Sequence, residues 1–337
     1  MKRKNNLQPI TFFLNIFKIQ LSLLLCFYGV LGVGQSQNLS LSTKENPNDS
    51  GIYLVVLGTV QDAGSPHIGC RKSCCKHLFV KGDSTRKVVS LGMIDQYNSK
   101  KYLIEATPDI TSQLRDLSIA SSLTSTDVPD GIFLTHAHIG HYAGLMYLGR
   151  EALGASHVPV YAMPMMQKYL ESNGPWDQLV NIKNIKTVGL HNETAVKLSD
   201  SLSIVPFLVP HRGEYSETVG YKIIGPSKTV LFIPDIDKWH LWDKSILDEL
   251  ESVDYAFIDA TFYDAAEVNH RNISEIPHPF IEESMQLFEN LPIKQKNKVH
   301  FIHFNHTNPA LNDQDPKSKV IYDKGFNIAK YGQIIRL

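Results

Sequence analysis

The chain has 337 residues, of which 43% are hydrophobic, which is enough apolar material for a large folded core. Lysine plus arginine (33) nearly balance aspartate plus glutamate (34), and the formal net charge is −1. A protein that binds nucleic acid or a membrane surface through charge normally carries a strong basic excess. The composition therefore argues against both of these classes, and we expect no nucleic-acid partner.

The N-terminal residues resemble a targeting segment. Basic residues at positions 2–4 precede an apolar stretch, strongest from Leu21 to Val33, and small residues follow at 34–36. This pattern predicts a secretory signal peptide (1–36), a polar linker (37–50) and an exported protein, periplasmic or secreted. An uncleaved anchor over Ile10–Val33 is the alternative and would be the only membrane contact. Lys18 interrupts that run and favours the shorter signal.

From residue 51 onward, strand-like and helix-like segments alternate. Short segments rich in Val, Ile, Phe and Tyr predict strands at Ile52–Gly58, Val88–Ile94, Lys101–Ala106, Gly131–Thr135, Val158–Ala162, Ile204–Val209, Val219–Ile224, Thr229–Ile233, Tyr255–Asp259 and Val299–Phe304. Helices are expected at Ile110–Leu117, Tyr142–Leu153, Met163–Ser172, Lys238–Leu250 and Phe280–Glu289. The strands come in runs, which favours an α/β fold with two packed sheets and outer helices, an αββα four-layer sandwich over residues 51–337.

Three of the chain's 14 histidines lie within the stretch His136–His141. The apolar strand Gly131–Thr135 leads directly into them, so the cluster belongs to a sheet edge and not to a solvated tail. In extended backbone, residues two apart point the same way, so His136 and His138 face one point. The chain then turns at Gly140, and His141 can reach the same centre. Neutral imidazoles suit zinc and other first-row metals.

This stretch resembles the signature H-x-H-x-D-H of the metallo-β-lactamase superfamily. Gly140 stands where that signature has an aspartate, which in the family belongs to the second metal site. The departure predicts one catalytic metal, or a second site that is weakened.

The resemblance implies further ligands at later strand ends, namely His211, Asp235 and His303. His136, His138 and His211 would hold one metal, while His141, His303 and Asp235 would hold a second; Asp235 and His141 are the expected catalytic residues. Asp237, two residues after Asp235, remains an alternative carboxylate.

Two acidic residues follow another predicted strand. Glu105 ends this strand, and the family has an acidic residue nearby that orients ligand histidines. Asp109 has the same potential role, but it is equally well explained as a loop residue or as a helix N-cap.

Outside the predicted signal, the cysteines cluster at Cys70, Cys74 and Cys75. An odd number of thiols fits a disulfide framework poorly, whereas three cysteines and one histidine make a closed structural zinc site. His77 and His67 are near in sequence. Subgroups of the superfamily instead complete such a cluster with a histidine three residues after the last catalytic ligand, which implies His306. A disulfide or free thiols remain the alternative.

Segments 57–66, 210–220 and 305–309 resemble the subgroup that includes coenzyme PQQ synthesis protein B and the phosphoribosyl cyclic phosphodiesterase. The resemblance implies a metal-dependent hydrolase of a small-molecule ester, such as a phosphodiester or cyclic phosphate. One or two catalytic zinc ions and one structural zinc ion are expected, and Mn²⁺ or Fe²⁺ would also suit the catalytic ligands. The alternatives are iron-dependent oxidation, or an accessory role in cofactor biosynthesis, which Gly140 favours. The three histidines and the predicted signal argue against simple transfer of the PQQ role.

Overall fold

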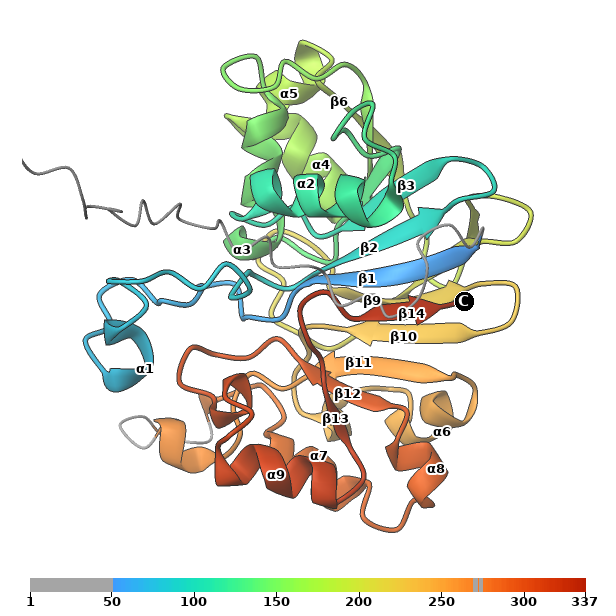
Figure 1. Cartoon of the computed structure of the whole chain (residues 1–337). Helices are drawn as coiled ribbons and strands as arrows, with labels where there is room; N and C mark the ends of the chain where they lie inside the picture. The colour runs from blue at the N-terminus through green and yellow to red at the C-terminus, as the bar shows by residue number, and fades with distance from the viewer. Residues whose placement is uncertain (1–50, 269–271, 273–274) are drawn as a thin grey trace, which may run out of the picture. The chain divides into compact units, whose positions relative to one another are not determined.

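The computed structural model describes residues 51–268, 272 and 275–337 (Figure 1). The predicted signal peptide (1–36) and linker (37–50) lie outside the described residues. Within the described part, no helix is both long enough and apolar enough to span a membrane.

The first sheet has seven strands within the described residues. In spatial order they are β14 (Ile334–Arg336), β1 (Ile52–Gly58), β2 (Ser90–Asp95), β3 (Lys100–Ile104), β4 (Gly131–Phe133), β5 (Val158–Ala162) and β6 (Ile185–Gly189). Pairing is antiparallel from β14 to β3 and parallel from β3 to β6. Strand β1 is buried along its whole length, which explains its unbroken apolar sequence.

The second sheet also has seven strands among the residues described. Their order is β13 (Asn327–Ile328), β12 (Val299–Ile302), β11 (Tyr255–Asp259), β10 (Thr229–Ile233), β9 (Val219–Ile224), β8 (Ser203–Leu208) and β7 (Val196–Lys197). Pairing is parallel from β13 to β10 and antiparallel from β10 to β7. The carboxyl ends of β10, β11 and β12 therefore lie side by side at one edge of the sheet.

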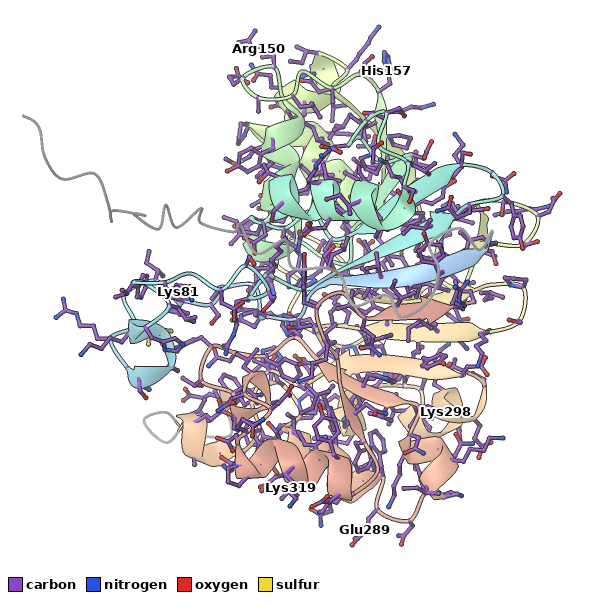
Figure 2. All side chains as sticks on the ribbon, viewed as in Figure 1. Lys81, Arg150, His157, Glu289, Lys298 and Lys319 are labelled. Atoms are coloured by element: carbon purple, nitrogen blue, oxygen red, sulfur yellow. The ribbon has the colours of Figure 1, made fainter. Side chains whose placement is uncertain are left out.

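Helices cover the outer face of each sheet (Figure 1). The α-helices of the described residues are α1 (Ser73–Lys76), α2 (Ile110–Ser121), α3 (Ile139–Tyr142), α4 (Pro164–Ser172), α5 (Trp176–Asn181), α6 (Ile246–Glu251), α7 (Ile281–Leu287), α8 (Ile293–Lys296) and α9 (Pro316–Asp323), of which α1 lies apart from both sheets (Figure 1). Apolar side chains of α2, α4 and α5 pack on the first sheet, and those of α6, α7 and α9 pack on the second. Charged side chains such as Lys81, Arg150 and Glu289 lie at the periphery (Figure 2).

A third apolar cluster fills the space between the two sheets. Phe133 of β4 stacks on Tyr161 with ring centroids 4.2 Å apart, and it meets Tyr221 of β9 edge-on at 5.9 Å. The order helix–sheet–sheet–helix confirms the αββα sandwich expected from the sequence. The ten predicted strands are present, with ends that differ by at most two residues.

Three predicted helices differ in their extent. The helix expected to end at Leu117 continues as α2 to Ser121, and two others are divided. The segment expected to form one helix over 142–153 begins earlier as α3 and continues as a 3-10 turn over Ala143–Leu148. There Gly144 lies so close to Thr107 that an added Cβ would be 2.1 Å from the threonine carbonyl oxygen. The helix expected over 238–250 is split into a 3-10 turn at Trp239–Leu241 and α6. The Ser245 side chain accepts a hydrogen bond from Asp248 N and so starts α6 anew.

The core between the sheets generates a stability prediction. Phe232 is fully buried there, so Phe232→Ala should lower the free energy of unfolding by about 3–5 kcal/mol. Phe79 is 59% exposed, and Phe79→Ala should change it by no more than about 0.5 kcal/mol. Denaturant unfolding followed by tryptophan fluorescence measures both values. Equal losses for the two variants would contradict the position assigned to Phe232.

Candidate metal centre

The residues that follow β4, β8 and β10 meet at one end of the sandwich. Potential ligand atoms of His136, His138, His211 and Asp235 all lie within 4.8 Å of one another. His138 retains the extended backbone expected of it (φ −78°, ψ 138°), and His136 is buried. The structure thus brings together His136, His138 and His211, which were predicted to share one metal ion, and places Asp235 beside them.

Asp235 is the shared centre of these contacts. It is 3% exposed, and its Oδ1 lies 3.3 Å from His211 Nε2, while its Oδ2 lies 3.4 Å from His136 Nε2 and 3.9 Å from His141 Nε2. Burial raises the pKa of this carboxyl, but the neighbouring imidazoles, His211 foremost, bring it well below its usual range. Asp235 is therefore an ionised carboxylate facing histidines of both predicted metal groups.

A second ligand group consists of His141, His303 and Asp62, again with ligand atoms within 4.8 Å of one another. Both histidines are fully buried, and the Nε2 atoms of His141, His303 and also His136 have no hydrogen-bond partner. Buried ring nitrogens are costly when unpaired. Such unpaired nitrogens beside the carboxylates of Asp235 and Asp62 fit a site for divalent metal ions.

Two threonines orient ligand histidines through the same arrangement. The Thr135 hydroxyl oxygen lies 2.5 Å from Glu105 Oε1 and 2.9 Å from His136 Nδ1. Because a carboxylate only accepts, the threonine donates to Glu105 and accepts from His136 Nδ1–H. The lone pair of His136 therefore lies on Nε2, which faces the site.

The Thr261 hydroxyl repeats this pattern on the second sheet. It donates to Asp259 Oδ1 at 2.7 Å and accepts from His303 Nδ1 at 2.9 Å, which leaves the His303 Nε2 lone pair free. His303 (φ 68°) and Glu105 (φ 74°) both have left-handed backbone conformations. Such strain costs roughly 1–3 kcal/mol per residue and is held only where the surroundings impose it.

Carboxylates lie directly beside the Nδ1 atoms of His211 and His141. Asp237 Oδ1 lies 2.8 Å from His211 Nδ1, so Asp237 holds the ligand histidine from behind, while Asp235 faces the site. Glu105 Oε1 also lies 3.4 Å from His141 Nδ1, as expected for an orienting carboxylate. Asp109 lies at the N-cap position of α2, and its Oδ2 accepts a hydrogen bond from Val88 N at 2.8 Å.

The carboxylates also set the protonation of the imidazoles. Burial, together with His141, holds the pKa of His136 well below its usual range. Burial lowers the pKa of His211, but Asp235 and Asp237 raise it to about 9. Burial also lowers the pKa of His141, but Glu105 and Asp62 raise it to about 8. Without metal, these two rings are protonated at pH 7. A metal ion must displace those protons, so its affinity rises with pH up to about 9.

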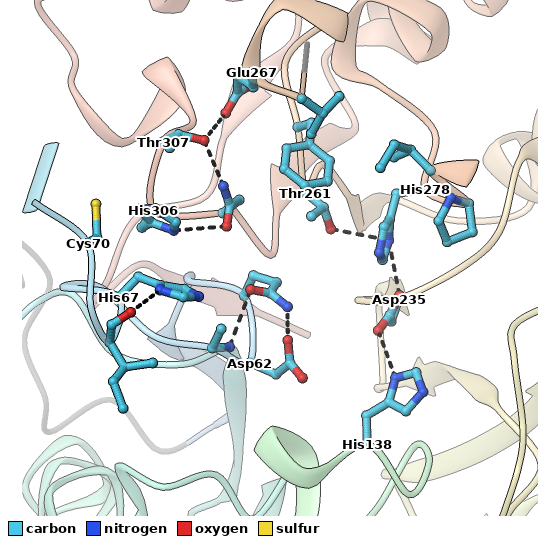
Figure 3. Close-up of a pocket in the computed structure, with 18 of the residues that line it drawn as sticks. Asp62, His67, Cys70, His138, Asp235, Thr261, Glu267, His278, His306 and Thr307 are labelled. Atoms are coloured by element: carbon cyan, nitrogen blue, oxygen red, sulfur yellow. Dashed lines mark hydrogen bonds and ion pairs between the residues drawn. The ribbon is translucent and has the colours of Figure 1, made fainter. Parts of the chain in front are cut away.

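His278 and Asp259 also lie at this site, although neither was expected from the sequence. His278 Nδ1 lies 3.2 Å from Asp235 Oδ1 (Figure 3) and 2.8 Å from Asp259 Oδ2. Asp259 ends the apolar strand β11, the same signal that identified Asp235 on β10. His278 follows in a loop, with no ligand spacing that would have revealed it.

A cavity of about 680 Å³ is lined by some of these groups, namely Asp62, His138, His211, Asp235 and His278. His138, Asp235 and His278 are on one part of its wall, and Asp62 and His306 on another (Figure 3). Three basic residues line it as well: Arg71, Lys72 and Arg212. Arg212 Nε donates to His138 Nε2 at 3.0 Å. The cavity therefore combines metal-ligating groups with cationic side chains.

The three cysteines form a separate group with His306, again with ligand atoms within 4.8 Å. The Sγ atoms of Cys70 and Cys75 each lie 3.9 Å from that of Cys74, and none of the three forms a disulfide. Burial and then His67 hold the pKa of His306 at about 4, so its ring is a neutral donor. His77 lies outside the group, with its Nδ1 3.1 Å from Ser73 O.

Comparisons with known proteins agree on the fold. A family model described as "Beta-lactamase superfamily domain" matches residues 100–304. Coenzyme PQQ synthesis protein B of Klebsiella pneumoniae subsp. pneumoniae is 26% identical over 316 residues, which cover 85% of this chain and 98% of that protein. The protein of the same name from Gluconobacter oxydans is 24% identical over 310 residues, covering 85% and 99%.

Two solved structures are also similar. Zinc-bound PqqB from Methylobacterium extorquens gives a TM-score of 0.67 at 20% identity and covers 85% of this chain and 100% of that one. A diphosphatase from the PhnP family gives 0.55 at 24% identity and covers 85% and 97%. At these identities the similarity concerns the fold.

The contact between Asp237 and His211 generates a metal-affinity prediction. Asp237→Asn removes the charge that orients the imidazole of His211, so the zinc affinity of the group His136, His138, His211 and Asp235 should fall about 10–100-fold. Competition with a chromophoric chelator measures this affinity. The exposed Asp243 provides the control, since Asp243→Asn should leave the affinity unchanged. Equal affinities for the two variants would remove Asp237 from the site.

The cysteine group generates a second prediction. If it holds a structural zinc ion, Cys74→Ser should lower the zinc content by about one ion per chain. Native mass spectrometry counts the ions, and Ser73→Ala in the same helix is the matched control. An unchanged count, or a disulfide found by thiol titration of the wild-type protein, would refute the zinc assignment.

Proposed function

The chain belongs to the β-lactamase superfamily and has the metallo-β-lactamase fold, and we propose that it is a metal-dependent hydrolase of a phosphodiester or cyclic phosphate ester. One observation carries the proposal. A cavity with two adjoining groups of histidines and carboxylates is also lined by arginine and lysine side chains.

The residues of the site suit zinc. His136, His138, His211 and Asp235 would hold one ion, in accord with the zinc-bound structure of the relative from Methylobacterium. The same nitrogen and oxygen donors would accept Mn²⁺ or Fe²⁺. A bound divalent ion lowers the pKa of its water towards neutrality and so supplies hydroxide for attack on the ester.

Three cationic side chains on the cavity wall support an anionic substrate, although Glu267 and Glu275 also line the cavity. Arg71, Lys72 and Arg212 line the cavity and are all exposed to solvent there. Guanidinium groups match phosphate oxygens geometrically, and lysine contributes a point charge. A phosphate ester would be held between these cations and the ligand groups, whereas a neutral ester would gain nothing from them.

His278 is suited to protonate the leaving oxygen. Its ion pairs with Asp259 and Asp235 both involve Nδ1, so Nε2 is the ring nitrogen available to a substrate in the cavity. The buried Asp259 holds the ring in place and is itself held by Thr261. This arrangement provides a positioned acid beside the expected point of bond cleavage.

The test is hydrolysis by the zinc- or manganese-loaded protein of bis-p-nitrophenyl phosphate and nucleoside cyclic phosphates, with neutral esters and lactones for comparison. Phosphodiesters should be cleaved in preference. His278→Gln should lower kcat about 10²–10⁴-fold while the metal content stays that of the wild type. If the fully metal-loaded protein cleaves no phosphodiester, the proposed function is contradicted. If His278→Gln retains full activity, the role of His278 is contradicted.

A role in PQQ synthesis is the second candidate. It is supported by the match to the Klebsiella protein of that name over 98% of its length. In such a role the protein would restore PQQ production to a strain lacking that relative, whereas a phosphodiesterase of unrelated purpose would not. Redox-active iron in the protein purified from its native host would favour oxidation over hydrolysis.

A further inference from the structure

Gly140 lies where no side chain can be accommodated. A Cβ built on it would be 2.2 Å from Asp62 Cβ, 2.6 Å from Asp62 Cα and 2.7 Å from Asp62 O. Two of these atoms belong to the backbone, so a rotamer change cannot relieve the overlap. Asp62, from the loop that follows β1, therefore occupies the space beside Gly140 that a side chain at that position would need.

The side chain of Asp62 is directed towards the second ligand group. One of its carboxylate oxygens lies within 4.8 Å of ligand atoms of both His141 and His303. These two imidazoles are fully buried, and their Nε2 atoms have no hydrogen-bond partner. The group thus presents two unpaired nitrogen donors and one carboxylate to a common point.

Backbone hydrogen bonds hold the Asp62 loop beside His303. Gln61 N donates to Phe304 O at 2.8 Å, and Phe304 N donates to Thr59 O at 2.9 Å. The Gln61 side chain also donates to Asp62 Oδ1. Further along the same loop, Cys70, Cys74 and Cys75 gather around His306. The loop therefore contacts the segment after β12 at two places, through Thr59 and Gln61 before Asp62 and through the cysteines after it.

We propose that Asp62 is a metal ligand that replaces, from a different loop, the aspartate missing at position 140. Together with His141 and His303 it forms a second site for a divalent first-row metal ion, next to the group of His136, His138 and His211, and Asp235 lies between the two. Gly140 is then a steric requirement for Asp62 and not a sign of a weakened site. The proposal rests on the same metal centre as the proposed function, but it does not depend on which ester is cleaved.

The test counts zinc ions in the full chain, saturated with Zn²⁺ alone and then desalted. Wild-type protein should hold about three ions, one at the cysteine group and two at the catalytic groups. Asp62→Asn, which keeps the side-chain shape, should hold about two ions. Zinc bound by His141 and His303 alone should be held at least about 100-fold more weakly than in the wild type. Asp83→Asn, on an exposed residue in the same β1–β2 connection, should match the wild type.

Substitutions at Gly140 provide the reciprocal test. Gly140→Ala and Gly140→Asp should each lose the same ion as Asp62→Asn, because either side chain displaces Asp62. Circular dichroism and thermal unfolding verify that the variants are folded. If a variant at position 140 does not fold, the Asp62→Asn count decides alone. An Asp62→Asn count equal to that of the wild type, or a gain of metal in Gly140→Asp, would each overturn the proposal.

The outcome is separable from that of the proposed function. Loss of one ion in Asp62→Asn, with no phosphodiester cleaved by the wild type, would uphold the ligand role and reject the substrate class. If the protein cleaves phosphodiesters but Asp62→Asn leaves its metal content unchanged, the substrate class is upheld and the ligand role of Asp62 is rejected.

Discussion

The buried carboxylate of Asp235 is the constraint on which the site depends. An isolated ionised carboxylate in a protein interior costs several kcal/mol, so it needs nearby positive charge or a metal ion. Here imidazoles from the ends of β4 and β8 and from the loop after β11 surround it. Because these ends belong to both sheets, the site exists only when the two sheets are packed together. The apolar cluster between the sheets therefore supports the chemistry as well as the stability.

The same arrangement of hydrogen bonds orients a histidine on each sheet. A threonine hydroxyl joins a carboxylate to an imidazole, as Thr135 does for His136 and Thr261 for His303. Each chain of hydrogen bonds decides which ring nitrogen keeps its lone pair, and in both cases this is Nε2. Such partners orient ligands and raise their basicity. The strained backbone of Glu105 and His303 indicates that this orientation is maintained at an energetic cost.

The loop between β1 and β2 connects the two groups of candidate metal ligands. It contributes Asp62 to the group that contains His303, and three thiols to the cysteine group that contains His306. Burial, followed by the charge of Cys75, raises the pKa of Cys74 to about 12, so this thiol is protonated unless a metal ion binds it. A zinc ion at the cysteine group would thus also fix the loop that lines the cavity and carries Asp62.

Sequence patterns were sufficient for the features that depend on local periodicity and spacing. The apolar strands, the run from His136 to His141, the acidic strand end at Asp235 and the cysteine cluster all belong to this class. The tertiary structure alone decided which distant groups meet. Asp62 and His278 lie in loops without periodicity, and their partners are far away in the chain, so nothing in their neighbouring residues indicates their roles. Gly140 illustrates the difference: in the sequence it is a missing ligand, whereas in the folded chain it is the space that another loop's aspartate fills.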